Sequence, residues 1–261
     1  MMHRTGTLLL AVWLPAAAVW AEEAPSAPAA APSAAVAASA ADDTEADEPT
    51  VNARDPYESL NRKVFEFNDK LDANVLKPVA ETYQKVVPGM VRTGVSNVLG
   101  NLGDVWSAVN QLLQGKPGQA GEMTMRVITN TVFGIGGLFD QATELGLERH
   151  SEDFGQTLGR WGVPPGPYIV LPLLGASTAR DTVATPVDLY ASMDTQLVSG
   201  TSATVGVSVL KVVNTRANLL GASQLLDEVA LDRYSFFRDA YLARRRSQVY
   251  DGNPPDDDEN P

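Results

Sequence analysis

The stretch FGQTLGRWGVPPGPYIVLPLLGASTARD, from Phe154 to Asp181, decides how the middle of the chain folds. Nine of its 28 residues are glycine or proline, yet an apolar run from Tyr168 to Leu174 lies between them. Pro172 cannot donate a backbone hydrogen bond and the glycines favour turns, which excludes one long helix or a central strand. Because apolar side chains and backbone polar groups both need cover, we expect flanking helices to wrap this irregular segment, or the segment to line a non-aqueous space.

Helix signals dominate the rest of the chain. Asp55, Pro56 and Glu58 have the order of an N-cap, a first and a third helical residue, and apolar residues at helical spacing follow up to Leu71. Further helices are expected over 78–88, 90–98, 105–113, 117–133, 151–161, 178–186, where Pro186 interrupts, and 203–226, with a last helix capped by Asp232. The predicted fold class is therefore all-α.

The first residues have the features of a secretory signal peptide. A basic residue precedes an apolar stretch in 1–21, and small residues Val19 and Ala21 stand before Glu22. A membrane anchor is disfavoured because the apolar stretch is shorter than the ~20 residues that a span needs. We therefore expect export, with cleavage between Ala21 and Glu22.

Acidic residues concentrate in two segments outside the helical region. Segment 22–54 is rich in Ala, Pro and Ser followed by acids, and 251–261 is acidic with Pro, Gly and Asn, so both are expected to be disordered. The whole chain has a net charge of −12, but the single domain expected over 55–250 carries 18 basic and 20 acidic residues. A body so close to neutral gives no case for nucleic-acid binding, and a chain without cysteine has neither disulfides nor thiolate metal sites.

The residues that could carry chemistry are few, and no enzyme activity, metal or cofactor is predicted. His150 is the one histidine outside the signal segment, and no G-x-S-x-G motif accompanies it, which favours a solvated residue beside a helix. FGIGGLFD at 133–140 lacks the third glycine of a dinucleotide fingerprint and is either a helix end with a tight turn, or a hinge or close contact with a ligand. The basic run Arg244–Arg246 is either a solvated helix end or a contact for anionic headgroups.

Several ordered blocks of this sequence resemble one family, called MlaA or VacJ-like lipoproteins. The blocks are DPYESLNRKVFEFND at 55–69, VLKPVAETYQKVVP at 75–88, SNVLGNLGDVWSAVNQLLQGKPGQA at 96–120, TNTVFGIGGLFD at 129–140, the opening stretch at 154–181, RANLL at 216–220 and DRYSFFRDAYLARR at 232–245. The resemblance implies a ring-like bundle of amphipathic helices that lies in the inner leaflet of the outer membrane, on its periplasmic face, beside a trimeric porin. It also implies a central amphipathic channel that passes mislocalised outer-leaflet phospholipid to a soluble periplasmic carrier, with no bond made or broken.

By this resemblance, segment 154–181 is expected to form the channel wall and ridge, with 133–140 packed against it and Arg180 and Asp181 near headgroups. The candidate channel and ridge residues are Gly134, Gly136, Gly137, Phe139, Asp140, Gly159, Gly162, Gly166, Pro167, Tyr168, Leu171, Pro172, Leu174, Gly175, Arg180 and Asp181.

The chain departs from the family at one point. The family usually carries a lipidated cysteine just after the signal, and this chain has no cysteine. We therefore expect retention at the membrane through the apolar surface of the ring and a porin partner. Two alternatives stay open: a soluble periplasmic lipid-binding or interaction protein, and an exported hydrolase that uses His150.

Overall fold

The computed structural model describes residues 54–229 and 232–255. The expected signal peptide with its cleavage site at Ala21 and Glu22, the 22–54 segment apart from its last residue, and the acidic end from 256 onward lie outside the described residues. The elements are α1 (Glu58–Leu71), the π-helical turn η2 (Asp72–Leu76), α2 (Lys77–Val86), α3 (Gly89–Leu113), α4 (Pro117–Val132), α5 (Gln141–Glu144), α6 (Phe154–Arg160), β1 (Tyr168–Leu171), β2 (Gly175–Thr178), α7 (Ala179–Ala191), α8 (Met193–Gln196), α9 (Thr201–Val229) and α10 (Arg233–Val249).

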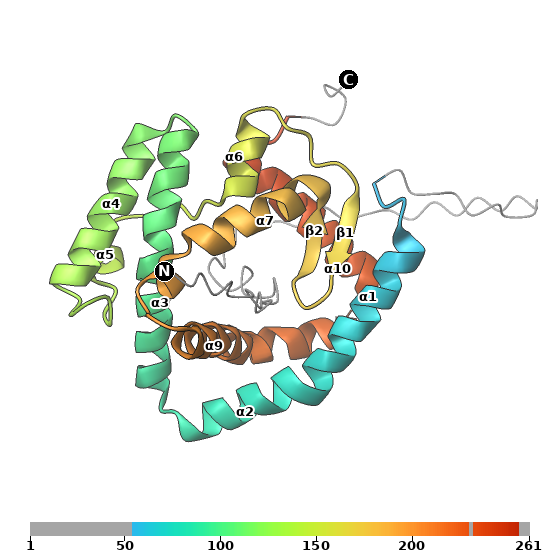
Figure 1. Ribbon diagram of the computed structural model, residues 1–261, viewed down its shortest axis with the longest axis horizontal. Helices are drawn as coiled ribbons and strands as arrows, with labels where there is room; N and C mark the ends of the chain where they lie inside the picture. Colours follow the sequence, from blue (N-terminus) through green and yellow to red (C-terminus); the bar gives the residue numbers. More distant parts are fainter. Residues whose placement is uncertain (1–53, 230–231, 256–261) are drawn as a thin grey trace, which may run out of the picture.

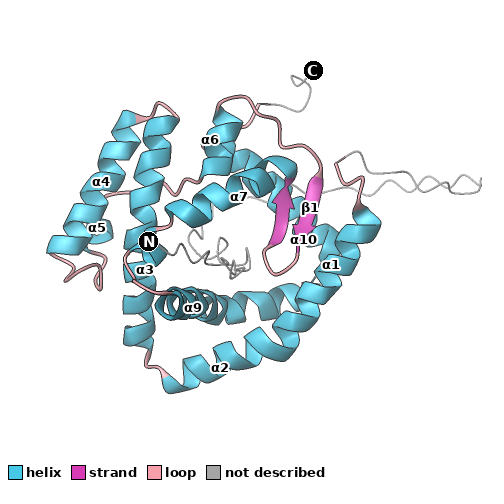
Figure 2. Cartoon of the chain, in the orientation of Figure 1, coloured by secondary structure: helices cyan, strands magenta, loops and turns pink. Residues whose placement is uncertain are grey.

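The helices are arranged around a common centre, which confirms the helical ring-like fold class (Figure 1). α1 and α2 form one part of the ring, and α3 forms the part across from α1 (Figures 1 and 2). α7 and the β1–β2 hairpin complete the ring. α9 packs on α2 and α3, while α4 packs on the outside of α3. Only two short strands occur in the part of the chain that the structure describes.

The predicted start of the first helix is wrong. α1 begins at Glu58 with Tyr57 in the N-cap position, and no side chain caps it. Asp55 is instead buried, where it accepts a hydrogen bond from Asn61 Nδ2 at 2.8 Å and another from the Tyr234 hydroxyl. Because a long-range contact with α10 occupies the carboxylate, the local capping pattern did not predict its role.

Two helices continue past expected ends, and a third junction is continuous. The helices expected at 90–98 and 105–113 are one helix, α3, because packing against α4 and α9 compensates for its internal glycines. α7 continues through Pro186 to Ala191. The wide π-turn η2 lets the chain run on from α1 into α2 past Pro78, whose ring and missing N–H would otherwise end a helix.

The apolar run in 154–181 is a β-hairpin rather than irregular chain, which corrects the expectation from sequence. β1 and β2 pair antiparallel from Tyr168 opposite Thr178 to Leu171 opposite Gly175. Pro172 stands in the turn, where no ladder hydrogen bond is needed from its nitrogen. Gly175, at the end of that turn, has a φ of +82°, a conformation that glycine adopts without strain.

Two asparagines of α1 hold the hairpin. Asn61 donates from Nδ2 to the Tyr168 carbonyl at 3.0 Å and accepts from the Val170 N–H at 2.9 Å. Seven residues later, Asn68 donates to the Leu171 carbonyl at 3.0 Å and accepts from the Leu173 N–H at 2.8 Å. The two amides stand where a neighbouring strand would pair, so α1 satisfies the outer edge of β1.

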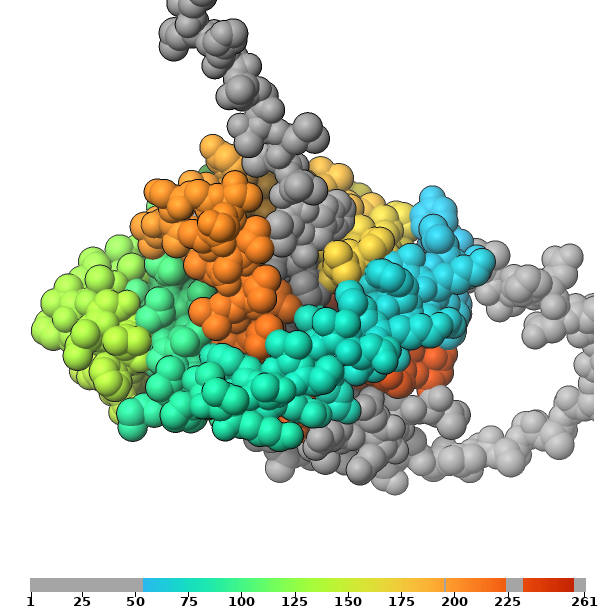
Figure 3. Space-filling model, turned by 60° about the horizontal axis from the view of Figure 1, so that its bottom comes forward, coloured from blue at the N-terminus to red at the C-terminus, as the bar shows by residue number. Residues whose placement is uncertain are grey.

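The distribution of polarity differs from that of an ordinary globule. The largest fully buried side chains include Arg126, Gln111, Asn61, Asn110 and Asn130, whereas the two described apolar core clusters are small. Large apolar side chains lie exposed on α1, η2, α2, α3 and α4: Leu60, Phe67, Val75, Val79, Val86, Val109, Leu112, Met125, Ile128 and Val132. Figure 3 shows α1, η2 and α2 as one continuous band across one face of the molecule. None of the described helices is long and apolar enough to cross a membrane.

Candidate functional site

A cavity of about 350 Å³ lies among α3, α6, α7, α9, α10 and the hairpin, and we call it the central cavity. Its apolar lining includes Leu102, Trp106, Leu171, Leu174, Leu189 and Val212, and its charged lining includes Asp153, Asp181, Asp188, Lys211, Arg244 and Arg245. An amphipathic lining of this kind suits a ligand with an apolar part and a charged part.

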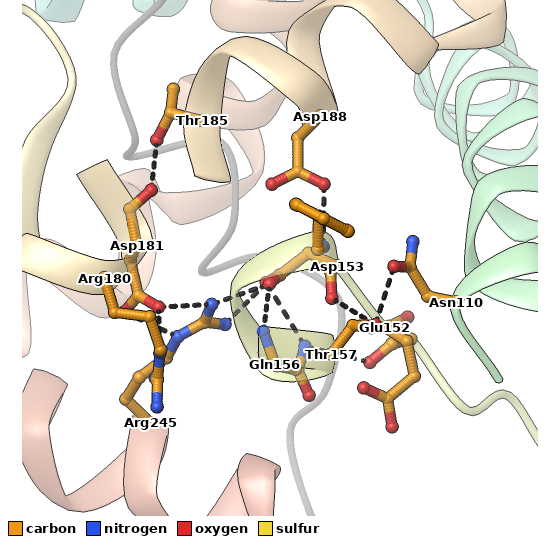
Figure 4. A network of polar contacts seen from close by, with 12 residues as sticks. Asn110, Glu152, Asp153, Gln156, Thr157, Arg180, Asp181, Thr185, Asp188 and Arg245 are labelled. Carbon is orange, nitrogen blue, oxygen red and sulfur yellow. Dashed lines mark hydrogen bonds and ion pairs between the residues drawn. The ribbon is translucent and has the colours of Figure 1, made fainter. Parts of the chain in front are cut away.

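Arg245 is the centre of a buried ion network beside the cavity (Figure 4). Its guanidinium reaches Asp153 at 2.5 Å and Asp181 at 2.9 Å. Burial alone would raise the pKa of the Asp181 carboxyl, but the charge of Arg245 and its hydrogen bonds outweigh burial and lower that pKa to about 2. The pKa of Asp153 is lowered for the same reason. The network therefore ties α10 to α6 and α7 at neutral pH.

Two glycines of α6 make room for this network. A Cβ at Gly155 would overlap Arg245 Nη2 and would lie 2.6 Å from Asp181 Oδ1. A Cβ at Gly159 would lie 2.6 Å from Arg180 Nη1 and 2.9 Å from Val249. A Cβ at either position would therefore displace side chains of the network, which glycine avoids.

Asp188 differs from the other carboxylates of the central cavity. Its Oδ1 accepts hydrogen bonds from Trp106 Nε1 and from the Phe154 N–H, each at 2.8 Å. Burial, with a further contribution from the negative charge of Asp153, raises the pKa of the Asp188 carboxyl to about 6. No ion pair joins Asp188 to a cation within residues 54–229 and 232–255.

The remaining acids around the cavity have basic partners. Asp104 pairs with Arg149 at 3.1 Å, and Glu152 pairs with Lys116 at 3.3 Å. Lys211, which lines the cavity from α9, pairs with Asp194 at 2.7 Å. Asp188 is thus the cavity carboxylate whose charge the protein itself compensates least.

The candidate residues of 154–181 fall into two groups. Leu171, Leu174 and Asp181 line the central cavity. The others do not line the cavity. Among the glycines and prolines, Gly159 packs on Arg180 and Val249, Gly162 and Gly166 have positive φ, Pro167 accepts a hydrogen bond from the Ala179 N–H, and Pro172 and Gly175 belong to the hairpin turn. Tyr168 is buried against Tyr234 and Tyr241, and Arg180 pairs with Asp181 at 3.0 Å. Arg180 and Asp181 are buried in the ion network rather than presented on a polar rim.

The glycine-rich candidates of 133–140 lie elsewhere, against α3. Gly134, Gly136, Gly137, Phe139 and Asp140 form the turn between α4 and α5, and none of them lines the central cavity. Asn101 of α3 packs on Gly137, whose φ is +91°, and Asn97 donates to the carbonyl of Leu138 at 2.9 Å.

Asp140 caps the short helix α5 and contacts the buried Arg126 at 3.2 Å. Burial alone would raise the pKa of Asp140, but hydrogen bonds from Thr143 and Asn130 and the charge of Arg126 lower it to about 2. Of the two interpretations of 133–140 from sequence, the structure has the helix end with a tight turn.

The sequence analysis did not single out Asp153 or Asp188 as site residues, and it considered Arg245 only as part of the basic run Arg244–Arg246. Asp181 and Asp188 are seven residues apart on α7, a spacing that places both on one helix face and was an available signal. The two interpretations of Arg244–Arg246 did not include burial, yet Arg245 is 7% exposed. His150 is half-buried, with Nε2 3.3 Å from Glu122.

Comparisons with known proteins agree with this architecture. A family model described as "MlaA lipoprotein" matches residues 53–248. The intermembrane phospholipid transport system lipoprotein MlaA of Escherichia coli (strain K12) is 36% identical over 211 residues, which cover 79% of this chain and 82% of that protein. The protein of the same name from Haemophilus influenzae is 37% identical over 203 residues, covering 76% of this chain and 80% of that protein.

A solved chain, described under "Structural basis for maintenance of bacterial outer membrane lipid asymmetry", has a TM-score of 0.65 and 36% sequence identity to this chain. The match covers 76% of this chain and 99% of the solved chain. The fold, the matched range and the identity lead to one conclusion: the chain belongs to the MlaA family.

Proposed function

We propose that this protein is the outer-membrane component of an intermembrane phospholipid transport system, and that phospholipid passes through the central cavity. The observation that carries the proposal is an exposed apolar surface combined with an internal cavity of mixed apolar and charged lining. Apolar side chains such as Leu60, Phe67 and Leu112 are exposed, whereas the internal cavity has charged side chains among its apolar ones. This distribution suits a body surrounded by acyl chains on its outside that carries headgroups inside.

The finer parts of the proposal concern export, location and partners. We infer a signal peptide over 1–21, a linker over 22–54, the helical domain over 55–250 and an acidic tail over 251–261. We also infer retention on the periplasmic face of the outer membrane beside a trimeric porin, and delivery of phospholipid to a soluble periplasmic carrier. Without a cysteine for lipidation, retention rests on the exposed apolar faces of α1 to α4.

The transport proposal is tested in a strain from which the gene is deleted. Phospholipid exposed on the cell surface should rise in the deletion strain and return to its original amount when the wild-type chain is supplied. Unchanged surface phospholipid after deletion would contradict transport.

A substitution at Leu171 tests whether this part of the hairpin lines the lipid passage or only belongs to the hydrophobic core. Leu171 lines the cavity and is half-buried, so Leu171→Asp should prevent complementation while protein abundance on an immunoblot stays near wild type. Leu171→Met, which conserves volume and polarity, should complement fully. Loss of the Leu171→Asp protein itself would indicate that the hairpin turn is only core.

The alternative is a soluble periplasmic lipid-binding protein without translocating activity. It predicts that the mature protein leaves washed membranes at physiological salt without detergent. The exposed apolar faces favour the opposite result, with the protein remaining in the membrane fraction.

A further inference from the structure

Asp188 lines the central cavity, and no ion pair joins its carboxylate to a cation among the described residues. Both of its hydrogen-bond donors, Trp106 Nε1 and the Phe154 N–H, approach Oδ1. The second oxygen, Oδ2, accepts no hydrogen bond from a residue that the structure describes (Figure 4). Because Asp188 lines the cavity and both of its described donors approach Oδ1, Oδ2 is the oxygen left to accept a hydrogen bond from a ligand there.

The neighbouring carboxylates do not compete for such a ligand. Arg245 satisfies Asp153 and Asp181, and Lys211 satisfies Asp194. A positive group that enters the cavity therefore gains most from Asp188, whose negative charge is destabilised by burial and by the nearby Asp153.

The chemistry of a matching ligand follows from the rest of the lining. Leu171, Leu174 and Leu189 offer an apolar wall, and Arg244 of α10 adds positive charge to the lining. A ligand with an apolar part, an anionic group and a cation that donates hydrogen bonds is complementary to all three features. A zwitterionic aminophospholipid has these parts, whereas a quaternary ammonium headgroup has no N–H to donate to a carboxylate oxygen.

A metal ion is a poorer match for Asp188. Hard cations take several oxygen ligands at once. No group of three or more metal-ligating side chains of the His, Cys, Asp or Glu type is present in the described ranges.

We propose that Asp188 accepts the primary ammonium of a phosphoethanolamine headgroup in the central cavity and so gives the protein a preference for aminophospholipid. This inference rests on the proposed function, because it names the class of phospholipid that the same cavity holds.

The experiment uses the full chain, purified in mild detergent and supplied with vesicles of phosphatidylethanolamine, phosphatidylcholine and phosphatidylglycerol in equal amounts and with identical acyl chains. Native mass spectrometry then measures the ratio of the three bound lipids. We expect wild-type protein to hold phosphatidylethanolamine in excess over phosphatidylcholine. Asp188→Asn should lower that ratio about tenfold, the scale expected for a hydrogen bond to a charged group.

The matched control is Asp69→Asn. Asp69 is an acid on α1 that pairs with Arg233 at 2.9 Å and does not line the central cavity, so its variant should keep the wild-type lipid ratio. The thermal stability of Asp188→Asn at neutral pH, measured in parallel, should equal or exceed that of wild type and so exclude misfolding as the cause of a changed ratio.

Three results would overturn the proposal. The first is a wild-type protein that binds the ethanolamine and choline lipids equally. The second is an Asp188→Asn variant with the wild-type ratio. The third is soluble O-phosphoethanolamine that competes as well as the intact lipid, because the site would then recognise a free amine rather than a lipid. Binding of lipid without headgroup preference leaves the transport proposal standing, whereas a wild-type chain that binds no lipid removes both.

Discussion

Asp188 shows how one residue in the cavity wall lowers stability at neutral pH. Burial and the charge of Asp153 raise its pKa to about 6, partly offset by Arg245 and by hydrogen bonds from Trp106 and the Phe154 N–H. Since the folded-state pKa lies above the unfolded value, the stability from this group is fully present below the unfolded pKa and is lost as pH rises through about 6.

Replacement of Asp188 by Asn should therefore stabilise the protein at pH 7.5. The asparagine Oδ1 can still accept from both donors but carries no charge, and the gain in unfolding free energy should be on the order of 2 kcal/mol. The gain should shrink below about 1 kcal/mol at pH 4, where the folded wild-type carboxyl is already neutral. Urea unfolding at the two pH values measures both; a variant less stable than wild type at pH 7.5 would contradict the sign.

Gly155 gives a second prediction at the scale of one residue. The Cβ of Gly155→Ala would force Arg245 away from Asp153 and Asp181, which should cost about 2 kcal/mol or more in unfolding free energy. Gly121→Ala is the matched control, because a Cβ at this position in α4 meets nothing within 4 Å and should stabilise the helix by about 0.5–1 kcal/mol. Equal stability of the two variants would show that α6 can move away from α10 at little cost.

At the scale of elements, α1 and the hairpin depend on each other through Asn61 and Asn68. Asn61→Ala leaves the Tyr168 carbonyl and the Val170 N–H without their partner in a buried site, which should cost about 2 kcal/mol. Hydrogen exchange of the Val170 amide should accelerate together with the loss of stability measured by urea unfolding.

The control for this prediction is Asn74→Ala. The Asn74 amide donates only to the Lys70 carbonyl within its own helical run and is exposed, so its loss should change stability by less than about 0.5 kcal/mol. If the Val170 amide of Asn61→Ala kept its full protection, α1 would not be what holds the edge of β1.

At the scale of the whole molecule, the exposed apolar faces should determine membrane association. Leu60 and Phe67 lie on one face of α1 and are 60% and 54% exposed. Replacing both by serine should lower the vesicle partition coefficient about a hundredfold in flotation, because burying each large apolar side chain contributes about 1.5–3 kcal/mol. Replacing the exposed Lys63 and Glu66 of the same helix by serine should leave flotation unchanged in neutral vesicles. Equal flotation of the two double variants would place the membrane contact on another face.

The sequence by itself determined the helical class and many of the caps and turns at which helices begin and end. Asp232 caps its helix as predicted, Thr178 is the cap of α7 where the sequence offered Thr178 or Ser177, and Gly115, with a φ of +76°, ends α3 just before Pro117 opens α4. Caps and turns act over a few residues, so their signal is present in the local pattern.

The tertiary structure alone decided how these parts meet. The 168–174 run became the first strand and the turn of a hairpin because Asn61 and Asn68, about 100 residues earlier, satisfy its edge. Arg245 is buried because Asp181, 64 residues away, and Asp153 are its partners. Asp188 has no ion pair of its own among the described residues, and the charge of Arg245 offsets only part of the rise in its pKa. Periodicity shows which face of a helix is polar, but only packing brings charges from distant helices together and so determines which of the acids that line the central cavity has no ion pair.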